Sequence, residues 1–308
     1  MTSITKTLAV VSVAMTCALS AHATGTYAAT KYPFVLAHGA AGFDKIGPID
    51  YWYGITTDLR NNGAKVYTTS MSAMNSSDVR NEQFLKDFQQ IMAISGAAKY
   101  HLVGHSHGAH SIRYVAAIMP DKVASVTSVN GVNAGTPVAD FVSGLTSFLG
   151  PVGTDVAAAL VNGLGKIEAY LSGNPSLPQD SIAMMNSLTT AGMKIYNQRY
   201  PAGVPTTTCG QGAAQVNGVR YYSWGSATVL TNPLDPLDLF VGATSVAFLG
   251  APNDGLMGKC AQHLGTVIRN DYAMNHFDAV NQALGLRGFF NPVPLYRQHA
   301  NRLKLAGL

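Results

Sequence analysis

The sequence predicts an α/β protein with a mainly parallel sheet and helices on both of its faces. Two observations support this prediction. Short apolar runs alternate with stretches of helical spacing through residues 32–131, and such alternation is typical of a parallel sheet covered by helices. Two of the apolar runs end in glycine-rich turns, HGAAG and GHSHG. Because the reactive loops of a parallel sheet lie at the carboxyl ends of its strands, we expect a functional site at these turns.

The expected elements follow one another in a simple order. Residues 32–39 form an apolar run, and residues 65–72, KVYTTSMS, are rich in strand-forming residues. Residues 79–96 have apolar side chains at helical spacing, namely Phe84, Phe88, Ile91 and Ile94. A short buried strand, YHLV at 100–103, then precedes GHSHG. The helical stretch 109–119 and a further strand at 123–131 follow.

Residues 141–200 differ from the rest because they contain no obvious strand and are rich in glycine and alanine. Apolar residues recur there at helical spacing, at Val156, Leu160, Leu164, Ile167 and Leu171. We expect a helical insertion over the strand ends, with residues 141–175 as a mobile lid. An ordinary helix packed on the core is the alternative.

The first 23 residues have the features of a secretory signal peptide. MTSITK carries one positive charge, an apolar run follows, and Ala21-His22-Ala23 has the small-x-small form of a cleavage site. Residues 24–308 would then form one domain, because no linker, charge block or repeat marks a boundary. An uncleaved anchor is the alternative, although the run is short for a bilayer span. We therefore expect a secreted protein.

Composition narrows the possible partners. The 308 residues carry a formal net charge of +4, which falls to +3 when Lys6 leaves with the signal peptide. So small and dispersed a charge argues against a nucleic-acid-binding surface. Only 12% of the residues are charged and 47% are apolar. This suits a protein that works against an apolar phase, although a well-buried α/β core would look similar.

Cysteine usage predicts one disulfide. Cys17 lies in the signal peptide, which leaves Cys209 and Cys260. In an exported and therefore oxidising setting we expect these two to pair. Closing a loop of this length is worth roughly 3–4 kcal/mol in the chain-entropy model. Two free buried thiols are the alternative.

Residues 104–110, GHSHGAH, allow a metal-site interpretation. His105, His107 and His110 have the H-x-H-x-x-H spacing of some zinc hydrolases. Such a site needs further carboxylate and histidine ligands to hold an open zinc coordination position. The acidic residue usual before the third histidine is replaced by Ala109. The zinc interpretation is weakened but stays open.

The same letters also spell G-x-S-x-G, with Ser106 at the centre. A serine on a sharp strand-to-helix turn needs small neighbours, which Gly104 and Gly108 supply. The helix N-terminus offers backbone N–H groups to an oxyanion, so we assign one donor to His107 and expect the second from HGAAG. We interpret Ser106 as a nucleophile. The rings of the three histidines then need only packing or supporting roles.

A serine nucleophile requires an acid and a histidine base, which follow it in that order in this kind of fold. Asp254 follows the apolar run SVAFL at 245–249 and lies in a Gly/Pro turn, which we interpret as a loop at a strand end. His276 comes 22 residues later and is the preferred base. His263 and His299 are the alternatives, and His299 lies in a basic helical stretch that favours a structural role.

The chain also resembles the secreted bacterial triacylglycerol lipases of the Pseudomonas and Burkholderia type, lipase families I.1 and I.2. The matching stretches run over nearly the whole mature chain: YPFVLAHGAAGFD, DYWYGI, GAKVY, HLVGHSHG, RYVAA, YYSWG, LDPLD, NDGLMGKC, NHFDAVNQALGLRG and RQHANRLKLAGL. The resemblance implies an α/β-hydrolase fold and a Ser106, Asp254, His276 triad. It further implies an oxyanion hole formed by the backbone N–H groups of Ala40 and His107.

A structural Ca²⁺ ion is implied by the resemblance alone. Its carboxylate ligands would be Asp235 and Asp278, and backbone carbonyls of Gln282 and Leu286 would complete the site. Oxygen ligands of this kind suit calcium. Asp278 is two residues from His276, so the ion would stabilise the loop that carries the base. Two ordinary surface aspartates are the alternative.

The resemblance also implies the Cys209–Cys260 disulfide, a membrane-anchored periplasmic foldase as folding partner, and type II secretion. Two stretches depart from the family pattern. The residue after HG is usually bulky and apolar but is Ala40 here, which predicts an altered chain-length or stereochemical preference. The chain has GVNAGTP, residues 131–137, where many relatives have P-H-x-G, and we expect only a local difference in packing.

These patterns together predict a secreted lipase that hydrolyses triacylglycerol through an acyl-serine intermediate at a lipid–water interface. An esterase or polyester hydrolase of the same fold, with a preference for short acyl chains, is the nearest alternative. A zinc hydrolase and a catalytically silent lipid-binding relative are the others.

Overall fold

A computed structural model describes residues 25–144 and 177–308. Its strands are β1 (Phe34–Ala37), β2 (Lys45–Ile46), β3 (Ile49–Asp50), β4 (Val66–Thr68), β5 (Tyr100–His105), β6 (Val123–Val129), β7 (Gln215–Val216), β8 (Val219–Ser226) and β9 (Thr266–Tyr272). Within these residues the main sheet has seven strands in the order β4-β1-β5-β6-β8-β7, and β9 also pairs with β8. Every pairing in this sheet is parallel except that of β7 with β8, and β2 and β3 form a separate antiparallel pair. The predicted mainly parallel α/β fold is confirmed.

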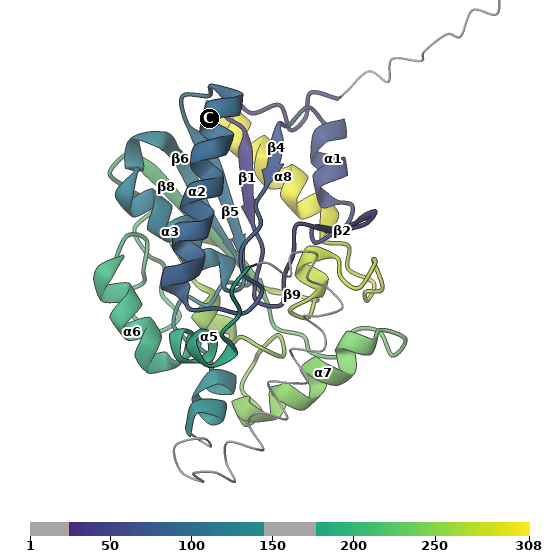
Figure 1. Ribbon diagram of the computed structural model, residues 1–308. Helices are drawn as coiled ribbons and strands as arrows, with labels where there is room; N and C mark the ends of the chain where they lie inside the picture. The colour runs from purple at the N-terminus through teal and green to yellow at the C-terminus, as the bar shows by residue number, and fades with distance from the viewer. Residues whose placement is uncertain (1–24, 145–176) are drawn as a thin grey trace, which may run out of the picture.

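Helices cover both faces of this sheet (Figure 1). The helices are α1 (Ile55–Asn61), α2 (Ser77–Ser95), α3 (Gly108–Ile118), α5 (Ser181–Leu188), α6 (Thr190–Arg199), α7 (Pro236–Thr244) and α8 (Val293–Leu305), and residues 137–144 are also helical. The short 3-10 turns are η1 (Pro120–Lys122), η2 (Ser245–Phe248), η3 (Lys259–Gln262) and η4 (Asp278–Val280). No helix in the described part of the chain is long and apolar enough to cross a bilayer.

Two apolar cores flank the sheet and hold these helices. On one face, Phe84 and Phe88 of α2 and Ile112 of α3 pack against strand residues such as Leu102. On the other face, side chains of α1 and α8 pack around Trp52. Each strand at the centre of the sheet is buried along its whole length, as expected for a parallel sheet covered on both sides.

Phe84, Phe88 and Ile91 of α2 are buried, whereas Ile94, in the last turn of that helix, is 79% exposed. One local expectation was wrong. The run SVAFL is not a strand: Ser245–Phe248 forms the 3-10 turn η2 directly after α7, and only Phe248 in it is buried. A short apolar run cannot be assigned to strand or helix by periodicity. Asp254 therefore follows a helical segment.

The predicted lid falls mostly outside the described residues. Of the range 141–175, only 141–144 is described, as the end of the helix that begins at residue 137. The apolar stripe from Val156 to Leu171 and the predicted signal peptide, residues 1–23, also lie outside them.

Candidate active site

Ser106 occupies a sharp turn between β5 and α3, as the G-x-S-x-G pattern predicts. Its backbone has a φ of 54°, which a non-glycine residue adopts only where the surroundings require it. A Cβ on Gly104 would lie 2.4 Å from the carbonyl oxygen of Gly108, and one on Gly108 would lie 2.3 Å from that of Ala37. Both glycines are therefore required, because the strand, the turn and the helix are in direct backbone contact.

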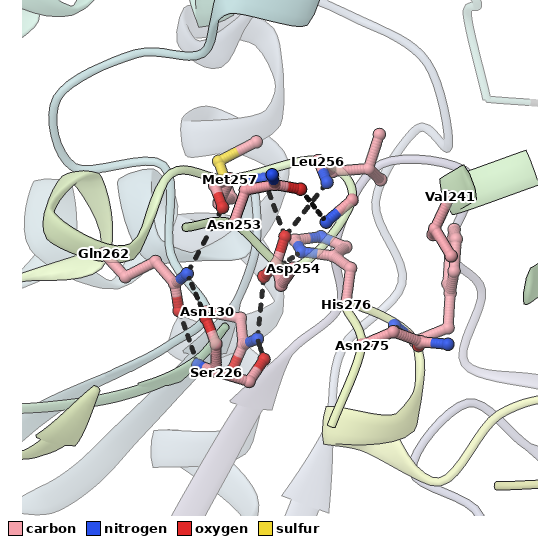
Figure 2. A network of polar contacts seen from close by, with 12 residues as sticks. Asn130, Ser226, Val241, Asn253, Asp254, Leu256, Met257, Gln262, Asn275 and His276 are labelled. Atoms are coloured by element: carbon pink, nitrogen blue, oxygen red, sulfur yellow. Dashed lines mark hydrogen bonds and ion pairs between the residues drawn. The ribbon is translucent and has the colours of Figure 1, made fainter. Parts of the chain in front are cut away.

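Asp254 and His276 form a buried hydrogen-bonded pair (Figure 2). Nδ1 of His276 lies 2.9 Å from Oδ2 of Asp254, and the side chains are almost completely buried. The other carboxylate oxygen accepts the backbone N–H groups of Leu256 and Met257, at 3.0 and 2.6 Å. Because Nδ1 donates to the carboxylate, Nε2 of a neutral His276 is free to accept a proton.

Ser106, His276 and Ala40 line one cavity of about 610 Å³. The remaining lining is mostly apolar, and much of it comes from α5, from α7 with η2, and from the helix 137–144, with Met184, Leu188, Phe240, Val246 and Phe141 among its members. An apolar cavity with a few polar groups at one place is the usual form of a small-molecule site.

Two backbone N–H groups near Ser106 are free to bind an anion. Within the described residues, neither Ala40 nor His107 donates its backbone N–H to a protein acceptor. His107 immediately precedes α3, where the helix dipole adds to the attraction for negative charge. The turn containing Ala40 is held by Arg80, which donates to the carbonyls of His38 and Gly39 at 2.7 and 3.1 Å.

The three histidines of GHSHGAH are buried and engaged with different partners. Nδ1 of His105 contacts the hydroxyl of Tyr51 and its Nε2 contacts the carbonyl of His276, at 2.7 and 3.0 Å. Ser77 contacts both His107 and His110, at 3.0 and 2.8 Å. No group of three possible metal-ligating side chains occurs within the described residues. This geometry does not fit the zinc interpretation.

Burial keeps these histidines neutral. It lowers the pKa of His110 to about 3, against opposition from a hydrogen bond to the carbonyl of Val132. Burial, together with the nearby charge on Arg80, also holds the pKa of His107 well below its usual value. The pKa of His105 is lowered by burial first and by His276 second. None of them is a cation at neutral pH.

The alternative bases have partners elsewhere and do not line the cavity. Nδ1 of His263 contacts the carbonyl of Gly210, at 2.8 Å. His299 lies on α8, where it contacts Thr127 and accepts from Arg302, at 2.9 and 3.0 Å. The structural role expected for His299 agrees with these contacts.

A cluster of carboxylates lies beside the loop that carries His276. Burial raises the pKa of Asp235 to about 6, with a further contribution from Asp238. Burial also raises the pKa of Asp278 to about 6, and both neighbouring aspartates add to the effect. Oδ2 of Asp235 and Oδ1 of Asp278 are buried and have no hydrogen-bond partner in the described part of the chain.

Because no three side chains in the described residues are placed to hold a metal ion together, a hard cation beside Asp235 and Asp278 would also need backbone oxygens. The backbone carbonyls of Gln282 and Leu286 accept no hydrogen bond within the described residues, so carboxylate and carbonyl oxygens are both available, as Ca²⁺ requires. Asp238 was not foreseen. Its carboxylate accepts from Thr231 and Asn232, at 2.6 and 2.8 Å, so it supports the cluster.

Asn130 was also missed. It donates its side-chain N–H to Oδ2 of Asp254 at 2.8 Å, and it directly follows β6. The signal that could have identified it was available, because a polar residue at the carboxyl end of a parallel strand is well placed for a site. The predicted disulfide between Cys209 and Cys260 is confirmed.

Comparisons with known proteins agree with this architecture. The family profile described as alpha/beta hydrolase fold matches residues 32–244. A triacylglycerol lipase of Vibrio cholerae is 51% identical, over 94% of this chain and 93% of its own. That of Pseudomonas fragi is 44% identical, over 91% and 98%. That of Burkholderia plantarii is 40% identical, over 94% and 90%.

Solved structures support the fold independently. The mature lipase BlEst2 of Bacillus licheniformis has a TM-score of 0.58 at 16% identity, over 88% of this chain and 92% of its own. The lipase of Staphylococcus hyicus has a TM-score of 0.56 at 17% identity, over 90% and 97%. Together with the sequence relatives, these findings place the chain in the α/β-hydrolase fold, and it belongs to the family of bacterial triacylglycerol lipases.

Proposed function

We propose that this protein hydrolyses the ester bonds of triacylglycerols, with Ser106 as nucleophile, His276 as base and Asp254 as the acid that orients the base. The observation that carries the proposal is that Ser106 and His276 line one apolar cavity, with His276 hydrogen-bonded to Asp254. The related proteins are triacylglycerol lipases, which supports triacylglycerol as the substrate.

The first half of the reaction forms an acyl-enzyme. The Ser106 oxygen attacks the ester carbonyl carbon while its proton passes to Nε2 of His276. The N–H groups of Ala40 and His107 donate to the tetrahedral oxyanion, each worth about 3–4 kcal/mol by analogy with measured oxyanion donors. The carbon–oxygen bond to the glyceride then breaks, and His276 returns the proton to the leaving alcohol.

The second half releases the fatty acid. A water molecule gives a proton to His276 and attacks the acyl carbon, and the same N–H groups stabilise the second oxyanion. Collapse of this intermediate breaks the bond to Ser106, which recovers its proton from His276. Asp254 stays ionised and stabilises the imidazolium form in both halves.

The apolar surroundings favour a long acyl chain at a lipid–water interface. Besides the apolar cavity, Val246, Leu249 and Phe141 are 72%, 93% and 59% exposed and belong to its lining. Exposed apolar groups around a site are typical of surfaces that meet lipid. A lid formed by residues 141–175 would cover and uncover this rim. A short-chain esterase or polyester hydrolase of the same mechanism is the second candidate, and rates on esters of increasing chain length separate the two.

Ca²⁺ has a supporting role in this proposal. Asp235 and Asp278, with the carbonyls of Gln282 and Leu286, would hold the ion, and its positive charge would offset the repulsion between the two buried carboxylates. The ion would stabilise the loop of His276 and would take no part in the chemical steps. Export through a signal peptide at residues 1–23, and folding with a periplasmic foldase, complete the proposal. Secretion assays with and without the leader and with and without a co-expressed foldase test them.

The decisive experiment measures fatty-acid release from a triolein emulsion by the wild type and by Ser106→Ala, with circular dichroism of both proteins. We expect the wild type to release fatty acid, and the variant to fold normally while losing activity by at least about 10⁴-fold. Activity that survives in the folded variant would contradict the proposed nucleophile. Absence of release by the wild type, with hydrolysis of short esters, would favour the second candidate.

A further inference from the structure

Asn130 lies at the carboxyl end of β6 and faces the proposed triad. Its backbone has a φ of 44°, a left-handed conformation that asparagine tolerates better than most residues. Its N–H donates to the carbonyl of Trp224 on β8, at 3.0 Å. The side chain is completely buried. Its position is therefore fixed by the sheet itself.

The contacts of Asn130 fix the orientation of its amide, although they leave its Oδ1 buried without a hydrogen-bond partner in the described residues. A carboxylate accepts hydrogen bonds and donates none, so the nitrogen of the amide must face Asp254. This nitrogen lies 2.8 Å from Oδ2 of Asp254 and 2.5 Å from Oγ of Ser226. Ser226 is held in turn by Gln262, which accepts its N–H and donates to its carbonyl, at 3.0 and 2.9 Å (Figure 2).

Asn130 completes the set of donors on the carboxylate. Oδ1 of Asp254 receives two backbone N–H groups from its own turn. Oδ2 receives His276 and Asn130. Without Asn130, His276 would be the only remaining side-chain donor to Asp254 in the described residues. His276 is the group that Asp254 has to orient, so it cannot also fix the carboxylate.

We propose that Asn130 is a positioning residue for catalysis, which acts by holding the Asp254 carboxylate in the plane and rotamer from which it orients His276. The inference rests on the proposed function. Preorganised supporting contacts of this kind determine how precisely a catalytic group is held.

The effect should appear in turnover and leave substrate binding unchanged. Asn130 does not line the cavity, so it cannot contact the acyl chain. A carboxylate that rotates away from His276 lowers the rate of proton transfer in both halves of the reaction, since small misplacements of catalytic groups have large kinetic effects. We therefore expect kcat to fall while KM stays the same.

The test compares two buried asparagines. Asn130→Gly removes the amide and retains a residue that tolerates positive φ. The matched control is Asn133→Ala: Asn133 is 1% exposed, and its side-chain N–H groups also make two bonds, to Ser128 and to the carbonyl of Gln262, at 2.8 and 3.0 Å. Steady-state hydrolysis of soluble p-nitrophenyl butyrate gives kcat and KM, and thermal unfolding is recorded for each variant.

We expect Asn130→Gly to lower kcat by about tenfold with KM unchanged, and Asn133→Ala to lower stability without lowering kcat. Asn130→Asp, which keeps the shape but faces Asp254 with a second carboxylate, should lower kcat further, by about 100-fold. Ser226→Ala should lower kcat less than Asn130→Gly. It should have no further effect on kcat in the Asn130→Gly background, because both substitutions interrupt the same contact.

The outcomes separate this inference from the proposed function. Equal kcat for wild type, Asn130→Gly and Asn130→Asp would overturn the role of Asn130 while Ser106→Ala still abolishes hydrolysis. A parallel loss of kcat in Asn130→Gly and Asn133→Ala would also overturn it, because the loss would then be structural. If folded Ser106→Ala keeps its activity, the proposed function fails first. If Asn130→Gly does not fold, Ser226→Ala alone decides: an unchanged kcat contradicts the inference.

Discussion

Two regions of the proposed active site are stabilised by different interactions. The nucleophile half, residues 104–110, connects β5 to α3, and its histidines have partners within the protein. The base half, residues 274–286, lies in a loop with only the 3-10 turn η4 (Asp278–Val280). It borders a cluster of buried aspartates, two of whose oxygens have no partner in the described chain.

This difference shows what each half needs in order to form. The nucleophile half depends on short-range backbone contacts among strand, turn and helix, so it should form whenever the sheet forms. The base half brings like charges together, and buried like charges repel each other strongly unless a counter-charge is present. The stability of the base half should therefore depend on the ions in solution, and on calcium above all. Four predictions test this comparison.

The largest effect is expected from Gly108→Ala, which breaks the nucleophile half. The new Cβ would meet the carbonyl oxygen of Ala37, in β1, at 2.3 Å, and backbone at the centre of the sheet cannot move aside. We expect activity to fall by at least about 100-fold, with a loss of stability of about 3 kcal/mol in urea unfolding. Gly144→Ala is the control, since a Cβ at Gly144 meets no atom of the described residues within 4 Å. Normal activity in Gly108→Ala would mean that the turn is less crowded than its contacts indicate.

The base half should be broken by removal of calcium. We expect chelation to lower the free energy of unfolding by about 3–4 kcal/mol, if the ion was present at 100 to 1,000 times its Kd. Thermal unfolding with added Ca²⁺ or chelator measures this shift, and calorimetry measures binding. Asp278→Ala should be insensitive to both additions. The proposal is wrong if chelator-treated wild type binds no calcium and Asp278→Ala unfolds at the wild-type temperature.

The same contrast explains how much the sequence could predict. Ser106 and its turn were identified from five letters, because the glycines that the backbone requires are adjacent in the chain. The carboxylate ligands of the candidate ion site, Asp235 and Asp278, were identified only through a family resemblance, because they are far apart in the sequence. Asp254 was chosen as the triad acid because it was expected to follow a strand, but the preceding SVAFL run is a helical turn. The structure places its carboxylate 2.9 Å from Nδ1 of His276. Asn130 was missed although it lies at the end of a predicted strand, because nothing in the sequence pairs it with Asp254, 124 residues away.

Acid pH should destabilise the nucleophile half through His101, which lies on β5, the strand that leads to Ser106. Burial lowers the pKa of His101 to about 3 from an ordinary value of 6.5. Its Nδ1 contacts Ser125 and its Nε2 has no partner within the described residues. The titratable groups that face it are Tyr32, whose ring centroid lies 6.0 Å away, and His299, which burial keeps neutral. Neither carries a negative charge at acid pH that would stabilise a protonated His101.

The sign of the effect follows from the lowered pKa. The unfolded chain binds a proton at His101 more readily than the folded chain does. The contribution of neutral His101 to the free energy of unfolding is therefore complete above pH 6.5 and is lost as the pH falls toward about 3. Between about pH 6.5 and about pH 4.5 the loss is roughly 2–3 kcal/mol. His101→Gln, which cannot titrate, should show a shallower decline in urea unfolding over this range. An identical pH dependence in variant and wild type would contradict the prediction.

The smallest effect is expected where the two halves meet, at Ala40. This residue lines the cavity with Ser106 and His276, and its N–H is a proposed oxyanion donor, which a change of side chain leaves in place. Ala40→Leu adds apolar volume beside the reacting ester and should lower rates on long acyl chains relative to short ones by up to about tenfold. Rates on p-nitrophenyl esters of increasing length measure the change. An unchanged chain-length profile would mean that the acyl chain is bound away from this turn, along the wall formed by α5 and α7.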